Sequence, residues 1–115
     1  MSQRIVDIIG FKEDLGLDCD TLKDLYTVFV EELIQERERV NSHVILDEVE
    51  LIRKSVHNIK GIASSYRTEL VFESAKDLDF KLKHRDFEEL SSFVADLNKR
   101  IDEAVKEIRL YFGER

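Results

Sequence analysis

The sequence predicts an all-α protein, an antiparallel four-helix bundle with a short extra helix at its N-terminus. Its 115 residues include no proline and only four glycines, so little interrupts a regular backbone. Apolar residues recur at helical spacing along four longer segments, which are separated by connections of a few residues. Hydrophobic residues make up 43 % of the chain, enough for a buried core in a single domain spanning residues 1–115.

Two helices are expected in the N-terminal part of the chain. A short helix is expected over residues 3–15, where Ile5, Ile8, Ile9 and Phe11 are apolar. The first long helix is expected over residues 21–41. Thr21 with Asp24 resembles an N-terminal cap, and residues 41–42 (Asn-Ser) indicate a break before the next helix.

Three further helices are expected over residues 45–66, 68–83 and 87–112. The last has the most regular apolar stripe. Its start is indicated by Asp86 and Glu89 in a capping-box arrangement, and its end by Gly113.

Composition excludes several classes of function. The formal net charge of −7 disfavours nucleic acid as a partner. The single cysteine, Cys19, excludes an intramolecular disulfide and paired-cysteine chemistry. No apolar run approaches the roughly 20 residues that span a bilayer, and the N-terminal apolar stretch is too short and too charged for a signal peptide. We therefore expect a soluble, cytoplasmic protein with no membrane partner.

His57 is expected to face solvent from the middle of the helix over residues 45–66. At 100° per residue the apolar positions cluster opposite this histidine. That stripe consists of Ile52, Ser55, Ile59, Ile62, Ala63, Tyr66 and Leu70.

Gly61 lies one turn after His57 and is an unusual choice inside a helix. An exposed glycine there costs about 1 kcal/mol relative to alanine. Helical side chains lean toward the N-terminus, so a glycine at this position leaves the imidazole uncovered. Close packing of Gly61 against another helix is the alternative, although this residue is on the face away from the apolar stripe.

The same region carries an unusual charge distribution. Residues 51–68 contain no acidic side chain but four basic ones, so the window carries +4 and the rest of the chain −11. A phosphate group or an acidic partner surface suits such a patch, and a plain solvated basic face is the alternative. The basic residues, which we expect to contact a partner or a phosphate, are Arg53, Lys54, Lys60 and Arg67.

These residue types favour covalent phosphoryl transfer to a side chain. A neutral imidazole is a competent nucleophile near neutral pH, and Lys60 can donate to phosphoryl oxygens, with Ser64 as a further donor. We expect no cofactor or metal site of the protein's own, because the sequence offers neither a carboxylate cluster beside His57 nor a glycine-rich ATP loop. The protein is therefore not expected to be a kinase, and its partner must supply the metal.

The run Val-His-Asn-Ile-Lys-Gly-Ile-Ala-Ser-Ser, residues 56–65, resembles the signature of histidine-containing phosphotransfer (HPt) domains, His-x-x-Lys-Gly followed by small residues. The similarity extends over most of the chain, through residues 25–33, 70–82 and 86–97. The signature alone is of moderate specificity. Its expected position on the solvent-exposed face of a bundle helix strengthens the resemblance.

The resemblance implies a role for each matching residue. His57 would be phosphorylated on Nε2, Lys60 would stabilise the phosphoryl group, and Gly61 would keep the approach open. Such proteins exchange phosphoryl groups with an aspartate of a response-regulator receiver domain, or receive them from a histidine kinase relay. The receiver domain supplies Mg²⁺. The chain departs from the family at Ile62, often a small residue, and at Arg67, often glycine.

Two other functions remain open from the sequence. The chain could be a bundle that binds a receiver or kinase without carrying phosphate, which Arg67 favours. It could also be a purely structural helical oligomer, although we expect a monomer. His43 and His84 are interpreted as exposed loop residues without a relay role.

Overall fold

The computed structural model describes residues 5–113, and within this range the chain is all-helical with no strand. The helices, in chain order, are α1 (Ile8–Leu15), α2 (Cys19–Ile45), α3 (Val49–Ser65), α4 (Glu69–Lys83) and α5 (Leu90–Tyr111). The first two residues of the helix expected over 3–15 lie outside the described part. An all-α protein with a short N-terminal helix is therefore confirmed for residues 5–113.

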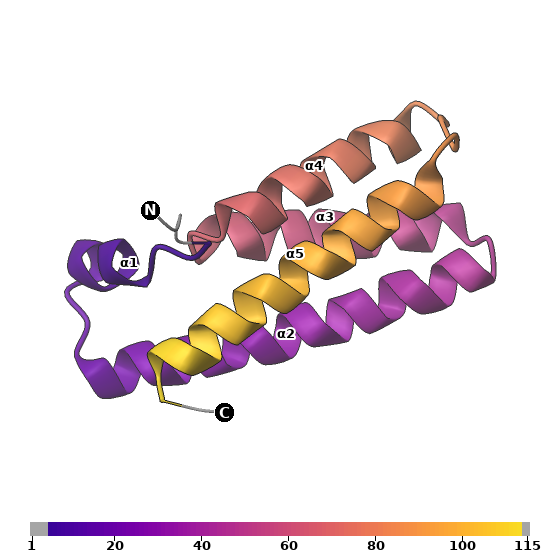
Figure 1. Ribbon diagram of the computed structural model, residues 1–115. Helices are drawn as coiled ribbons and strands as arrows, with labels where there is room; N and C mark the ends of the chain where they lie inside the picture. Colours follow the sequence, from indigo (N-terminus) through magenta and orange to yellow (C-terminus); the bar gives the residue numbers. More distant parts are fainter. Residues whose placement is uncertain (1–4, 114–115) are drawn as a thin grey trace.

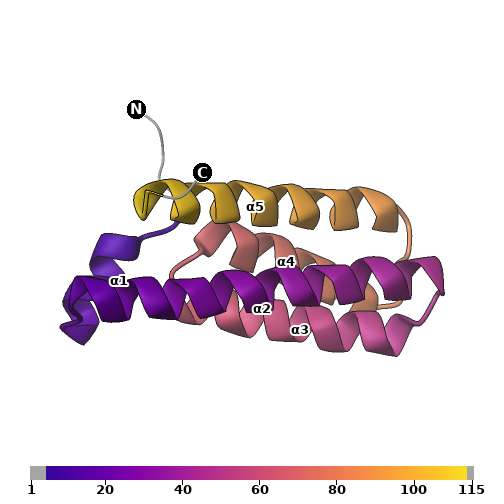
Figure 2. The same cartoon turned by 90° about the horizontal axis from the view of Figure 1, so that it is seen from below.

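The four longer helices lie side by side, and α1 covers one end of them (Figures 1 and 2). The α2–α3 and α4–α5 connections lie at the opposite end, away from α1 and the α3–α4 turn (Figure 1). Helix α3 packs against both α2 and α4, while α5 packs against α4 and α2. None of these helices combines the length and the hydrophobicity that a membrane span would need.

An aromatic cluster holds α1 against the longer helices. The Phe11 ring stacks on Tyr66 with ring centroids 5.3 Å apart, and Tyr66 stacks on Phe29 at 4.6 Å. The Tyr26 hydroxyl donates to the Tyr66 backbone carbonyl at 2.9 Å, and burial raises the pKa of this phenol. These contacts fix the end of α3 relative to α1 and α2.

Helix α2 is longer than the sequence predicts at both ends. It begins at Cys19 because Asp18, not Thr21, is the cap. The Asp18 carboxylate accepts a hydrogen bond from the Thr21 backbone N–H at 2.7 Å, which lowers the pKa of Asp18. The predicted break at residues 41–42 was wrong. The Asn41 side chain accepts a hydrogen bond from Asn98 of α5 at 3.0 Å, so it does not compete with the backbone, and α2 continues to Ile45.

Helix α5 begins three residues later than predicted. The Asp86 carboxylate accepts from Lys81 at 3.0 Å and from the Glu88 N–H at 3.2 Å, so it does not form the expected capping box with Glu89. Glu89 has a left-handed φ of +59°, which separates residues 86–88 from the helix. The expected end is confirmed, because the helix stops at Tyr111 and Gly113 has a φ of +77°.

Candidate functional site

Helix α3 places His57 on its exposed face, as the sequence predicts. The opposite face is buried, with Ile52, Val56, Ile59 and Ala63 at most 1 % exposed. Val56 was missing from the predicted stripe, while Leu70 belongs to α4 and is only half-buried. This burial against α2 and α4 fixes the rotation of α3 and therefore the direction of the histidine.

The His57 side chain lies on a ridge between two surface hollows. The hollow on the α2 side has a volume of about 390 Å³, and the hollow on the α4 side about 490 Å³. The α2-side hollow is lined by Glu32, Gln35, Glu36, His57, Asn58, Gly61 and Ile62. The α4-side hollow is lined by Glu50, Arg53, Lys54, His57, Lys60, Asp79 and Lys83. A group bound to the imidazole can therefore be contacted from either side.

Gly61 leaves open space beside the imidazole. Apart from its chain neighbours and the nearby backbone of α3, a Cβ atom built on this glycine meets no described atom within 4 Å. The alternative of close packing against another helix is therefore wrong. The predicted exposure of His57 is confirmed.

Lys60 shares the α4-side hollow with His57 but is engaged with a carboxylate. Its Nζ atom lies 3.1 Å from Oδ2 of Asp79 in α4. Sequence reasoning missed Asp79, because nothing in the pattern 19 residues downstream signals that it reaches α3. Lys60 is therefore positioned as expected, but with part of its charge neutralised.

Two of the other basic residues of the acid-free window, Arg53 and Arg67, also meet carboxylates from outside it. Nη1 of Arg53 lies 3.5 Å from Oε2 of Glu50. Arg53, which the sequence predicted to contact a partner, therefore has an acidic neighbour within its own chain. Lys54 is exposed on the rim of the α4-side hollow, and no ion pair of this lysine is found among residues 5–113. The positive patch is therefore smaller than the sequence count suggests.

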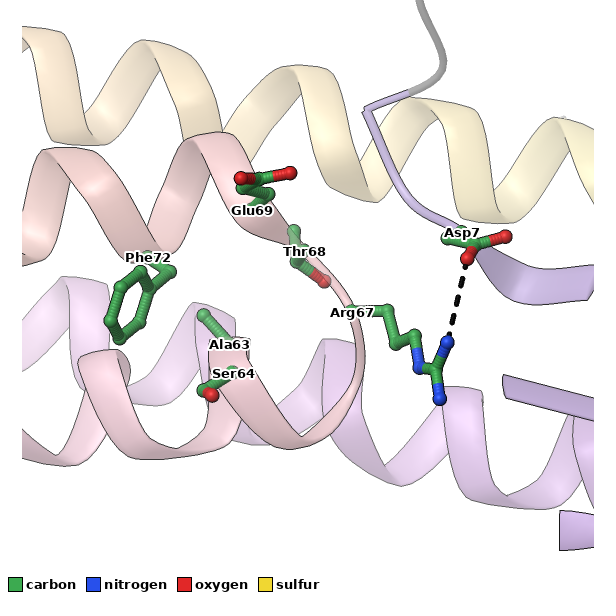
Figure 3. Close-up of a pocket in the computed structure, with 7 residues that line it drawn as sticks. All are labelled: Asp7, Ala63, Ser64, Arg67, Thr68, Glu69 and Phe72. Atoms are coloured by element: carbon green, nitrogen blue, oxygen red, sulfur yellow. Dashed lines mark ion pairs between the residues drawn. The ribbon is translucent and has the colours of Figure 1, made fainter. Parts of the chain in front are cut away.

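Arg67 lies in the α3–α4 turn and points toward Asp7, the N-cap residue of α1 (Figure 3). Its guanidinium pairs with Asp14, and with Asp7 at 3.6 Å, and the Asp14 hydrogen bond raises the pKa of Arg67. Its φ of +58° is a left-handed backbone conformation that favours glycine. The structure thus places Arg67 as an anchor for α1, although the sequence predicted a contact with a partner or a phosphate.

Ser64 does not share a hollow with His57. It lines a separate pocket with Asp7, Arg67 and Phe72 at the α3–α4 turn (Figure 3). Seven residues along a helix correspond to about 10 Å, so Ser64 is distant from the imidazole. The structure gives no support for Ser64 as a hydrogen-bond donor to a phosphoryl group on His57.

The α2-side hollow is acidic. Glu36 is only 7 % exposed, accepts a hydrogen bond from the Asn58 side chain at 3.3 Å and pairs with Arg39. Glu32 lines the same hollow. Among the described residues, no group of three or more histidine, cysteine or acidic side chains could hold a metal ion.

The other two histidines differ from His57 because their rings have partners. His43 belongs to α2, not to a loop as predicted, and its Nδ1 lies 3.3 Å from Glu48. The His84 ring stacks on Phe80 with centroids 4.2 Å apart, and its Nδ1 lies 2.9 Å from the Phe80 carbonyl. For His57, no hydrogen bond or ion pair is found within the described range.

Comparison of the chain with protein-family models, curated proteins and solved structures finds no match. Evidence for function therefore comes from the site itself. An unpartnered, exposed imidazole beside an open glycine and a lysine can act as a nucleophile toward a group presented by another molecule.

Proposed function

We propose that this protein is a phosphorelay carrier, an HPt-like antiparallel four-helix bundle that accepts and donates a phosphoryl group on His57. Its partners are the receiver domain of a response regulator and, in some relays, a histidine kinase. It acts in the cytoplasm as a monomer. The exposed, unpartnered ring of His57 beside Gly61 is the observation that carries this proposal.

The imidazole is the only group of this chain whose bonds change in the transfer step. The Nε2 lone pair attacks the phosphorus of an aspartyl phosphate on the receiver, forming the P–N bond. The P–O bond to the aspartate breaks, and the carboxylate leaves with its electron pair. Nδ1 keeps its proton, so the ring carries a positive charge in the product.

The partner supplies the remaining chemistry. Phosphoryl transfer depends on positioning and on neutralising charge at the phosphoryl oxygens, for which a receiver brings Mg²⁺. Lys54 and Lys83 on the α4-side hollow, with Lys60, provide cations on this chain. The open space at Gly61 lets the receiver approach the imidazole closely.

Incubation with a labelled, phosphorylated receiver domain and Mg²⁺ tests the proposal. We expect acid-labile label to move to the protein, and His57→Gln to abolish it while leaving the helical content unchanged. His84→Gln is the matched control and should accept label like the wild type. Absence of label on the wild type, or equal label on His57→Gln, would contradict the proposal.

A second candidate function is a receiver- or kinase-binding bundle that carries no phosphate. The engagement of Lys60 with Asp79, and of Arg67 with Asp7 and Asp14, favours it, because these cations are occupied within the chain. Under this function, receiver binding persists in His57→Gln and neither protein takes label. Label on His57 excludes it.

A further inference from the structure

The ion pair between Lys60 and Asp79 joins α3 to α4 at the α4-side hollow. The Lys60 side chain is 27 % exposed and that of Asp79 20 % exposed, with 3.1 Å between Nζ and Oδ2. A pair with this degree of burial is less screened by water than a fully exposed pair. Lys60, which is one of the cations next to His57, is therefore held by a carboxylate of its own chain.

A phosphoryl group on His57 competes with Asp79 for this lysine. The phosphoryl group carries up to two negative charges and three acceptor oxygens, more than a carboxylate offers. Lys60 follows His57 by three residues, so their side chains are neighbours on the helix surface. Because the Lys60 side chain is flexible, its ammonium group can move from the Asp79 carboxylate to the phosphoryl oxygens without a backbone movement.

Asp79 also acts on the phosphoryl group through its own charge. It lines the same hollow as His57, so its carboxylate and a phosphoryl group there are like charges that repel each other. Competition for Lys60 and direct repulsion both destabilise the phosphorylated state of His57. Both favour departure of the phosphoryl group, in which the P–N bond breaks with its electron pair returning to Nε2 and a P–O bond to the receiver aspartate forms.

Building on the proposed function, we propose that Asp79 is a positioning residue that limits how strongly the protein retains its phosphoryl group. It does so by holding Lys60 away from full engagement with the phosphoryl oxygens. Asp79 thereby biases the relay toward onward transfer.

The neutral variant Asp79→Asn tests this inference in the labelled-receiver assay. At equilibrium with the receiver and Mg²⁺, we expect the ratio of labelled protein to labelled receiver to rise about fivefold, or about 1 kcal/mol. The matched control is Asp77→Asn, which removes the same charge from an exposed position of α4 with no ion pair found among residues 5–113. We expect the control to change the ratio by less than about twofold.

Two further variants separate positioning from a structural role. In a Lys60→Gln background, most of the effect of Asp79→Asn should disappear, because the lysine it restrains is gone. Asp79→Glu, which keeps the carboxylate, should behave like the wild type. If Asp79→Asn loses its helical circular dichroism signal, Asp79→Ser is measured in its place.

The outcomes distinguish this inference from the function it builds on. An unchanged or lower ratio in Asp79→Asn, with label on the wild type, overturns the role of Asp79 and leaves the proposed function standing. A full effect that persists in the Lys60→Gln background also overturns it. If the wild type takes no label, the proposed function fails and this inference fails with it.

Discussion

The two faces of α3 differ in what their side chains contact. On the inner face Ile59 and Ala63 have no exposed surface and are packed between α2 and α4. On the outer face His57 and Gly61 are exposed and border two hollows. The same 17-residue helix therefore combines a face that determines stability with a face available for chemistry.

This separation means that the histidine is oriented by residues that never touch it. The buried side chains fix the rotation of the helix, so the imidazole points outward without a hydrogen bond to any residue of the range 5–113. A substitution on one face should therefore change one property and leave the other almost unchanged. The predictions below test this separation.

The largest expected effect on stability comes from the inner face. Ile59→Ala removes a fully buried side chain and leaves a cavity, so the free energy of unfolding should fall by about 2–5 kcal/mol in urea titrations. Under conditions where the variant remains folded, His57 should still accept label. A loss below about 1 kcal/mol would contradict the packing described for α3.

A smaller effect of opposite sign is expected at Gly61 on the outer face. Gly61→Ala should raise the free energy of unfolding by about 0.5–1 kcal/mol, because the added methyl group meets no described atom beyond the nearby backbone of α3 and its chain neighbours, and because alanine favours helix. Gly61→Leu should slow transfer from the receiver several-fold, because its side chain covers the imidazole.

Ser64→Leu is the matched control for Gly61→Leu, since Ser64 is exposed on the same helix but borders a different pocket. It should leave the transfer rate near that of the wild type. Equal rates for Gly61→Leu and the wild type would show that the open space at Gly61 has no part in the approach of the receiver.

Features that depend on local periodicity were predictable from the sequence. The burial of Ile52 and Ile59 and the exposure of His57 follow from positions one to two turns apart on one helix. The open space at Gly61 follows in the same way, since it depends on a missing side chain and on the face where it is missing. Helix ends were less predictable, because Asn41 is satisfied by Asn98, which is 57 residues away.

The charge of the site was the least predictable feature. Counting residues 51–68 gives four positive charges, but the fold brings Asp79 to Lys60 and Asp14 to Arg67, over separations of 19 and 53 residues. A count along the chain contains no information about such pairs. In the folded protein Lys60 is therefore paired with a carboxylate, and Arg67 anchors α1.

Mapping phosphorylation among the three histidines tests the central claim most directly, because it needs no partner protein. The wild type is treated with phosphoramidate, a small phosphoryl donor, and each histidine is followed by NMR and mass spectrometry. We predict that His57 is modified first and most completely, ahead of His43 and His84, whose rings already have partners. Modification of His43 or His84 with His57 left unmodified would contradict the account.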